Sequence, residues 1–331
     1  MASPSTAAIR LSQQDIDQFR RDGYLTVRGV LSADEVASLR RDAIRIANQC
    51  KDRGLVIVPS RNEILPVPDL VTWDEVGWLL SDERIVGLAR QLLGQQEIVY
   101  FGDSGIVVGA GARGFHKDNT ERVDRSHPDW QSDYTLLRFG IYLQDHVHHS
   151  GGLKIRAGSH NHADVTTGRS VDIATVPGDI VIWSLRTSHS GNVVKMRGLS
   201  WASIPIRLEA RLPQWLRVPE SETRVALFLT LAANDDHLRR YLAKYNDLQA
   251  YPNNYMYLLW QHSHWTPERM AKAAARGCQF LKPCPAFGSL YHPTAPIPGG
   301  PITPGRSKPD LYPVHGMERI IQGAGRLLRR T

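Results

Sequence analysis

From Glu97 onward the sequence consists of short apolar runs separated by turn residues. This pattern restricts the possible folds more than any other feature of the sequence. The runs are rich in Val, Ile, Leu and aromatic residues, which is the composition of β-strands. Many short strands at this spacing predict an antiparallel sandwich or jelly roll rather than alternating β-α units. The expected strands are Ile98–Phe101, Gly105–Val108, Leu136–Leu143, Gly152–Ile155, Ile173–Val176, Asp179–Trp183 and Leu199–Ile206, with one more over residues 224–231.

Helices are expected on both sides of this strand-rich region. Ser12 and Ser32 are each followed three residues later by an acidic residue, which is the spacing typical of helix N-terminal caps. The predicted fold class is therefore mainly β with flanking helices. Helices are expected after these two serines, with a strand at Tyr24–Arg28 between them, and at residues 82–93, 235–248 and 267–276.

No clear linker interrupts the 331 residues, which favours one domain with decorations over several separate domains. We predict a core with N-terminal helices over residues 1–210 and a C-terminal extension, residues 211–331, packed on the same domain. The segment from Pro283 to Pro313 holds nine of the twenty prolines, so we expect irregular structure there. A chain of this length buries a sufficient core without a metal, so a bound metal would serve chemistry.

Cysteine usage and hydropathy argue against secretion and membrane insertion. The three cysteines form no C-x-x-C pair and no even disulfide framework, which is typical of a reducing compartment. Residues 1–10 lack the apolar region of a signal peptide, and nowhere do eighteen apolar residues follow one another. We therefore expect a cytoplasmic protein that does not enter a membrane.

The formal net charge of +7 points to anionic partners in general terms. Proteins that bind nucleic acid concentrate Lys and Arg on one element, whereas here these residues are scattered. The exception is a small cluster at Arg326, Arg329 and Arg330. We expect no nucleic-acid partner, and a small anionic substrate is a milder use of the same positive field.

Three residues have the spacing of a metal site. His116 and Asp118 lie two positions apart, so on an extended segment both side chains point to the same face. His189 follows the turn and apolar strand Pro177–Trp183, which makes it a suitable third ligand. Two imidazoles and one carboxylate leave open positions on an octahedral metal, which suits iron(II) and O2, whereas structural zinc prefers a closed tetrahedron.

Arg197 is the arginine that the sequence offers for a dicarboxylate cosubstrate. It lies eight residues after His189, at the start of the expected strand Leu199–Ile206. If that strand returns beside His189, the guanidinium reaches into the barrel, where it needs an anionic partner. The alternative is a surface arginine in the turn at residues 193–198.

Several motifs in this order resemble the phytanoyl-CoA dioxygenase family of iron- and 2-oxoglutarate-dependent oxygenases. The resemblance covers residues 12 to 207. Ala157 stands where the family usually has proline, in a stretch similar to its G-x-L…P-G-S-H motif. The motifs are Phe19–Leu31, His116-Lys-Asp118, Ile141–Asp145, Gly151–His160, Pro177-Gly-Asp179, His189-Ser-Gly-Asn192 and Arg197.

The resemblance implies a double-stranded β-helix, a jelly roll of the cupin type. It implies Fe(II) bound by His116, Asp118 and His189, and 2-oxoglutarate bound through its 5-carboxylate by Arg197. The expected reaction consumes O2, converts 2-oxoglutarate into succinate and CO2, and hydroxylates a small organic metabolite, in keeping with specialised metabolism. Because halogenases of this type lack the carboxylate ligand, the presence of Asp118 disfavours halogenation.

Other outcomes and other residues remain open at this point. The same cofactors support desaturation, epimerisation or ring formation, and a non-catalytic cupin-like binding protein is the alternative of another class. Arg122 and Arg125 are candidates for contact with an anionic substrate group, and Tyr142 is a candidate for the pocket wall. We interpret the histidines between His146 and His162 as solvated loop residues rather than a zinc or nickel site.

Overall fold

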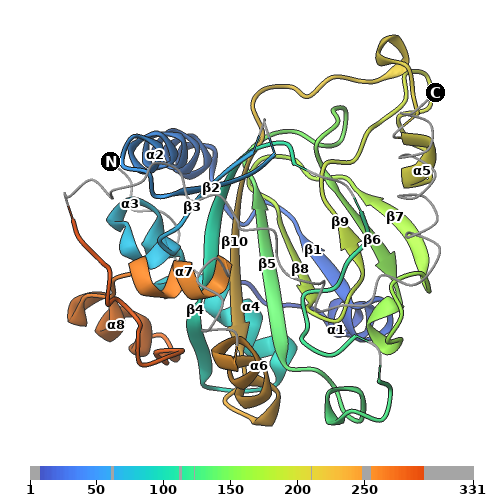
Figure 1. The fold of residues 1–331 in the computed structure, drawn as a ribbon. Helices are drawn as coiled ribbons and strands as arrows, with labels where there is room; N and C mark the ends of the chain where they lie inside the picture. Colours follow the sequence, from blue (N-terminus) through green and yellow to red (C-terminus); the bar gives the residue numbers. More distant parts are fainter. Residues whose placement is uncertain are drawn as a thin grey trace, which may run out of the picture.

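Two mainly antiparallel sheets form the body of the protein, and Figure 1 shows the smaller one facing the larger one. This computed structural model describes residues 8–60, 63–111, 114–122, 124–209, 211–247 and 255–293. The strands are β1 (Tyr24–Val27), β2 (Val56–Ser60), β3 (Glu63–Pro66), β4 (Ile98–Gly109), β5 (Leu136–Tyr142), β6 (Leu153–Ala157), β7 (Arg169–Ile173), β8 (Ile180–Ser184), β9 (His189–Ser190), β10 (Val225–Ala232) and β11 (Cys278–Phe280). The helices are α1 (Gln13–Asp22), α2 (Ala33–Asp52), α3 (Asp74–Gly77), α4 (Glu83–Leu93), α5 (Ile206–Glu209), α6 (Asp236–Asp247), α7 (Tyr255–His262) and α8 (Pro267–Ala274).

The strand order is that of a double-stranded β-helix. The larger sheet runs β1-β8-β5-β10-β4-β3-β2, with β11 beside β4, and the smaller sheet runs β7-β6-β9. Along the chain the strands change sides: β4, β5, β8 and β10 lie in the larger sheet, and β6, β7 and β9 in the smaller one. His116 extends the smaller sheet through a bridge to His189. The mainly β fold with flanking helices, a jelly roll, is confirmed.

The caps that the sequence indicated define the first two helices. The Ser12 side chain accepts a hydrogen bond from the Asp15 backbone, and the Asp15 carboxylate accepts one from the Ser12 backbone. Ser32 and Glu35 form the same reciprocal box at the start of α2. Each box satisfies backbone donors that the first turn of a helix leaves open.

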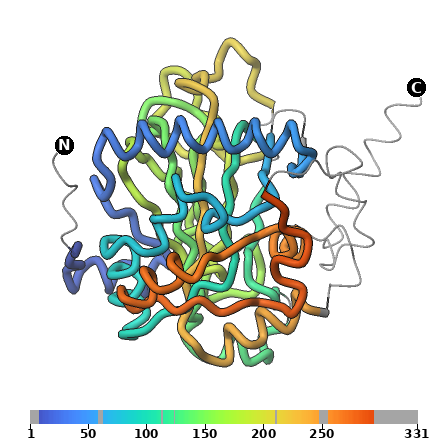
Figure 2. Tube along the Cα trace, turned by 90° about the vertical axis from the view of Figure 1, so that its left-hand side faces the viewer, coloured from blue at the N-terminus to red at the C-terminus, as the bar shows by residue number. Residues whose placement is uncertain are grey.

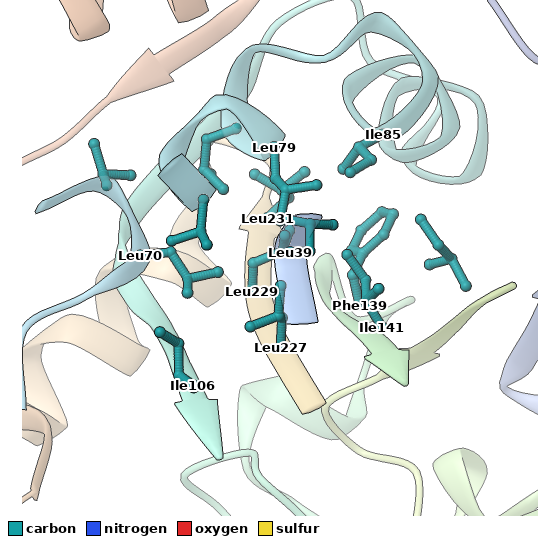
Figure 3. Close-up of a cluster of buried hydrophobic side chains, with 14 of the residues drawn as sticks. Leu39, Leu70, Leu79, Ile85, Ile106, Phe139, Ile141, Leu227, Leu229 and Leu231 are labelled. Atoms are coloured by element: carbon teal, nitrogen blue, oxygen red, sulfur yellow. The ribbon is translucent and has the colours of Figure 1, made fainter. Parts of the chain in front are cut away.

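Successive side chains of the central strands point alternately to two faces of the sheet. One face is covered by helices, and the other faces the barrel interior. Figure 3 shows Leu227, Leu229 and Leu231 of β10 packed with Leu39 of α2 and Ile85 of α4. In Figure 2, α2 runs across this outer face of the larger sheet, above the other covering helices. The alternate positions of β5 and β10 therefore face the smaller sheet, and they include Arg138, Tyr142 and Phe228.

Four of the expected strands differ in the structure. One strand, β4, covers both Ile98–Phe101 and Gly105–Val108. Within β4, Gly102 has a left-handed conformation with φ 80°. The expected strand Leu199–Ile206 is wrong: this segment consists of turns that lead into α5, and Trp201 is 83% exposed. Ile173–Val176 is shifted, because β7 ends at Ile173.

The sequence after residue 210 contributes a strand to the centre of the barrel. β10 lies between β5 and β4, so the predicted core over 1–210 and the predicted extension over 211–331 share one sheet. α6 follows β10, and α7 packs against β4. The Pro283–Pro313 segment lies mostly outside the described residues, as does the basic cluster at Arg326, Arg329 and Arg330.

Candidate functional site

His116, Asp118 and His189 converge at one end of the barrel. The His116 and His189 backbones pair, with N–O distances of 3.0 and 2.9 Å, and Asp118 N donates to Leu185 O at 2.9 Å. One ligand atom from each of the three side chains lies within 4.8 Å of the other two. Asp118 Oδ1 is 3.7 Å from His116 Nε2, and Asp118 Oδ2 is 3.5 Å from His189 Nε2. In the described part of the chain, this is the one group of three or more His, Cys, Asp or Glu residues close enough to share a metal.

Backbone carbonyls orient both imidazoles toward the shared centre. His116 Nδ1 is 3.0 Å from Gly114 O, and His189 Nδ1 is 3.0 Å from Thr187 O. A carbonyl oxygen only accepts, so each Nδ1 donates, and in the neutral ring the lone pair then lies on Nε2. This arrangement fixes the tautomer and ring orientation that a metal ligand requires.

The local electrostatics favour the protonation states of metal ligands. Burial acts to raise the pKa of Asp118, but His189, Arg138 and His116 together lower it well below its usual range. Burial lowers the pKa of His189 to about 4, against the opposing effect of the Asp118 carboxylate. Asp118 is therefore an anion and His189 a neutral imidazole at pH 7, as metal binding requires. One carboxylate and two imidazole nitrogen donors fit the facial set of non-haem iron(II).

Arg138 links this centre to a second buried carboxylate. Its Nη1 donates to Asp103 Oδ1 at 2.9 Å, and its Nη2 lies 3.6 Å from Asp118 Oδ2. Asp103 Oδ2 also accepts from Thr230 Oγ1 at 2.7 Å and from Tyr241 Oη at 3.3 Å. The sequence signal for this network is the single arginine within the apolar run of β5, and Arg138 was not among the predicted site residues.

Replacing Arg138 with methionine is expected to destabilise the metal-free protein by about 3 kcal/mol, because Asp103 then stays buried without its cation. The double variant Arg138→Met/Asp103→Asn is expected to recover at least about a third of that loss. Urea unfolding of the two variants and of Asp103→Asn measures both effects. Equal stability of wild type and Arg138→Met contradicts the role of this ion pair.

A cavity of about 390 Å³ opens onto the three converging side chains. Pockets of this size accommodate small-molecule ligands. Both sheets and two C-terminal helices contribute to its walls. The lining includes the three candidate ligands and Asp103, Arg122, Arg138, Tyr142, Trp183, Asn192, Arg224, Phe228, Tyr241, Tyr245, Tyr255 and Met256.

Arg224, directly before β10, is a buried arginine in this cavity. It is 4% exposed, and its Nε donates to Gly151 O at 3.0 Å. Its guanidinium carbon lies 5.6 Å from the centre of the Tyr142 ring. The buried Tyr142 hydroxyl has no hydrogen-bond partner of suitable geometry among the described residues, and burial raises its pKa to about 12, so it remains a donor. A cation beside a buried hydroxyl donor fits the distal carboxylate of a dicarboxylic acid.

The structure does not bring Arg197 to this cavity. Its side chain is exposed, and its Nε donates to Arg217 O at 3.1 Å on the loop that precedes β10. After His189 the chain does not lead directly into the next barrel strand, β10. The segment that carries Trp201 and α5 lies between them. The role predicted for Arg197 therefore lacks geometric support, whereas Arg224 is buried and lines the cavity.

The three substrate candidates separate in the structure. Tyr142 and Arg122 line the cavity, and Arg122 Nε donates to Asn119 O at 2.9 Å. Arg125 does not line it, and its guanidinium lies 3.0 Å from His162 Nδ1 on the exposed surface.

The interpretation of the histidines between His146 and His162 as solvated residues is wrong for two of them. His146 and His160 are buried, with 1% and 8% of their surface exposed. His146 Nε2 lies 3.0 Å from Gln144 Nε2, and His160 Nε2 lies 3.0 Å from Arg20 O. Both histidines act as hydrogen-bonding core residues.

Comparison with known families decides the classification. The model of the family described as phytanoyl-CoA dioxygenase matches residues 19–194, a range that contains the whole His-Asp-His cluster. The chain belongs to the phytanoyl-CoA dioxygenase family. Arg224, α6 and α7 lie beyond the segment that the phytanoyl-CoA dioxygenase model matches.

Individual relatives in the phytanoyl-CoA dioxygenase family match a similar part of the chain. The ectoine dioxygenase of Streptomyces coelicolor is 31% identical over 157 residues, which are 45% of this chain and 51% of that protein. The ectoine dioxygenase of Sphingopyxis alaskensis is 29% identical over 174 residues, 49% of this chain and 54% of that protein. The chain thus spans about half the length of the curated relatives it matches.

Solved structures give similarities of lower identity. The chain is similar to SnoN, a non-heme alpha ketoglutarate dependent epimerase from nogalamycin biosynthesis, with 19% identity, a TM-score of 0.49, and coverage of 67% of this chain and 80% of that one. It is also similar to EctD from S. alaskensis with bound Fe, with 20% identity, a TM-score of 0.45, and coverage of 67% and 77%. Among the helices of the described residues, none combines the length and apolar character needed to cross a membrane.

Proposed function

We propose that this protein is an Fe(II)- and 2-oxoglutarate-dependent dioxygenase that hydroxylates a small organic molecule. The observation that carries the proposal is the convergence of His116, Asp118 and His189 at a cavity that also contains a buried arginine. A cupin-like binding protein without catalysis has no need for this combination of an open metal face and a carboxylate site.

Each part of the site has a defined task in this proposal. His116, Asp118 and His189 hold Fe(II), and Arg224 with the Tyr142 hydroxyl holds the 5-carboxylate of 2-oxoglutarate. When bound, Fe(II) and 2-oxoglutarate supply the oxidation. O2 and 2-oxoglutarate give succinate and CO2, and one oxygen atom of O2 enters the substrate. Arg138 holds Asp118 in place, and the buried walls exclude water from the reacting atoms. Which substrate bond reacts depends on how the substrate lies relative to the metal.

The substrate is a small molecule that enters the remaining part of the cavity. Arg122 is the candidate contact for an anionic group, since it lines the cavity and carries a positive charge. The ectoine dioxygenases among the relatives make ectoine one compound to test.

The buried cysteines Cys50, Cys278 and Cys284 form no disulfide, which supports a cytoplasmic location.

Succinate formation tests the proposal. The purified protein is incubated with 2-oxoglutarate and O2, with and without Fe(II), and succinate is measured by NMR. Succinate that requires Fe(II), and that increases with a substrate such as ectoine, supports the proposal. Absence of any iron-dependent succinate with saturating Fe(II) and 2-oxoglutarate contradicts it.

A further inference from the structure

Two helices beyond the family match bring a group of tyrosines into the cavity. Tyr241 and Tyr245 come from α6, and Tyr255 comes from α7, next to Met256. The two helices pack against each other, and α7 also contacts β4 (Figure 1). The barrel supplies the metal site, whereas this wall comes from a segment that the family does not define.

The tyrosine rings are fixed by contacts with one another and with the core. The Tyr241 ring centre lies 5.5 Å from that of Phe101, edge to face, and 4.8 Å from that of Tyr245. The Tyr245 ring in turn lies 6.1 Å from the ring of Trp260. Such offset and edge-on geometries are those that aromatic rings prefer. The wall is therefore preorganised before any ligand binds.

Tyr255 approaches β4 at a position without a side chain. A Cβ atom placed on Gly105 would lie 2.9 Å from the Tyr255 hydroxyl oxygen, so any larger residue would push this hydroxyl from its place. Because Gly105 has no side chain, the Tyr255 hydroxyl can lie close to the backbone of β4. Both residues line the cavity, so the close approach shapes its wall.

The tyrosine wall lies next to the metal centre and carries little net charge. Tyr241 donates to Asp103, which pairs with Arg138, which lies beside Asp118. Asp103 and Arg138 neutralise each other at this place. The barrel also contributes rings, because Trp183 lies 5.2 Å from His189 and 6.3 Å from Phe228, centre to centre. A ligand between these walls meets ring faces and edges near the metal.

We propose that Tyr241, Tyr245 and Tyr255 form the substrate subsite and that this subsite takes an uncharged aromatic ring. The inference rests on the proposed function, since it assumes that the metal and 2-oxoglutarate occupy the other part of the cavity. Edge-to-face and offset contacts with several rings favour an aromatic ring over a saturated ring of equal size. The substrate class is therefore a small molecule that presents such a ring toward the iron.

Fluorine NMR with two matched probes tests the subsite. The probes are para-trifluoromethylphenol and para-trifluoromethylcyclohexanol, which share the hydroxyl and the reporter group and differ in aromaticity. Each is titrated into the full-length protein loaded anaerobically with 2-oxoglutarate and either Zn(II) or Mn(II). We expect the phenol to bind about ten-fold more tightly than the cyclohexanol. We also expect its signal to broaden far more with paramagnetic Mn(II), because the ring lies near the metal.

Leucine variants assign the preference to the tyrosines. Tyr245→Leu and Tyr255→Leu retain apolar volume but remove a ring, and each is expected to abolish most of the ten-fold preference. Tyr257→Leu is the matched control, because Tyr257 also lies on α7 but does not line the cavity, and it should retain the preference. Circular dichroism checks that every variant is folded.

The outcomes separate the subsite from the proposed function. Equal affinity for the two probes, no binding of the phenol, or a preference that persists in both cavity variants overturns the aromatic subsite. Binding of the phenol without broadening, in protein that holds Mn(II) through Asp118, shows that the ring lies elsewhere and also overturns it. Failure of the wild type to bind either metal contradicts the proposed function itself, and the subsite with it.

Discussion

Asp118→Ala is expected to lower iron-dependent succinate formation at least about a thousandfold, because the stabilisation that a bound metal supplies is worth several kcal/mol. Asp118 is the anionic member of the cluster and lies within 3.7 Å of both imidazoles. Alanine leaves two imidazoles and no carboxylate, a set that binds Fe(II) weakly and does not balance its charge. The succinate assay and an equilibrium measurement of Fe(II) affinity both report this loss.

The fold is expected to survive this substitution. Arg138 keeps its hydrogen bond to Asp103, so the buried guanidinium retains a partner when Asp118 is removed. Circular dichroism and urea unfolding should therefore show a folded variant. Asp133→Ala is the matched control, because it removes an exposed carboxylate outside the cavity and should leave turnover unchanged. Wild-type activity in Asp118→Ala refutes the assignment of the metal ligands.

Arg224→Ala is expected to raise the KM for 2-oxoglutarate by about a hundredfold, since a charge-assisted, bidentate contact to a carboxylate is lost. The Fe(II) affinity should remain close to that of the wild type, because Arg224 belongs to the carboxylate end of the cavity. Arg224→Lys keeps the positive charge but not the planar fork, so an intermediate KM is expected. Initial-rate measurements of succinate formation at varied 2-oxoglutarate provide these values.

Arg197→Ala distinguishes the two candidate arginines. The exposed Arg197 side chain contacts Arg217 O on the surface, so its removal should change the KM for 2-oxoglutarate by less than about two-fold. The lysine variant guards against a folding defect in Arg224→Ala, where Gly151 O loses its donor. A large effect of Arg197→Ala together with a small effect of Arg224→Lys and Arg224→Ala would restore the assignment made from sequence.

The parts of this structure that follow local rules could be predicted from the sequence. The capping boxes at Ser12 and Ser32 begin α1 and α2, and the apolar alternation locates most barrel strands. The two-residue spacing of His116 and Asp118 indicated that their side chains share a face. The structure brings them to His189, which four strands, β5 to β8, separate from them in sequence.

The parts that depend on distant residues could not be predicted. The segment Leu199–Ile206 has strand composition, yet the adjoining α5 is held by the fully buried Lys154 of β6, which pairs with Glu209 at 2.6 Å. Because this segment intervenes, the arginine that reaches the cavity is Arg224 rather than Arg197. The ion pair between Arg138 and Asp103 likewise joins two strands, β5 and β4, and no local sequence pattern predicts it.

Anaerobic titration of the metal-free protein with Fe(II) and 2-oxoglutarate, monitored by visible absorption, tests the central claim most directly. We predict a weak metal-to-ligand charge-transfer band that appears only when both are present, because the cosubstrate must chelate an iron that the protein holds. Arg224→Ala should shift its appearance to higher 2-oxoglutarate concentration, and Asp118→Ala should prevent it. A protein that forms no such band with saturating Fe(II) and 2-oxoglutarate, while binding another metal tightly, contradicts the account.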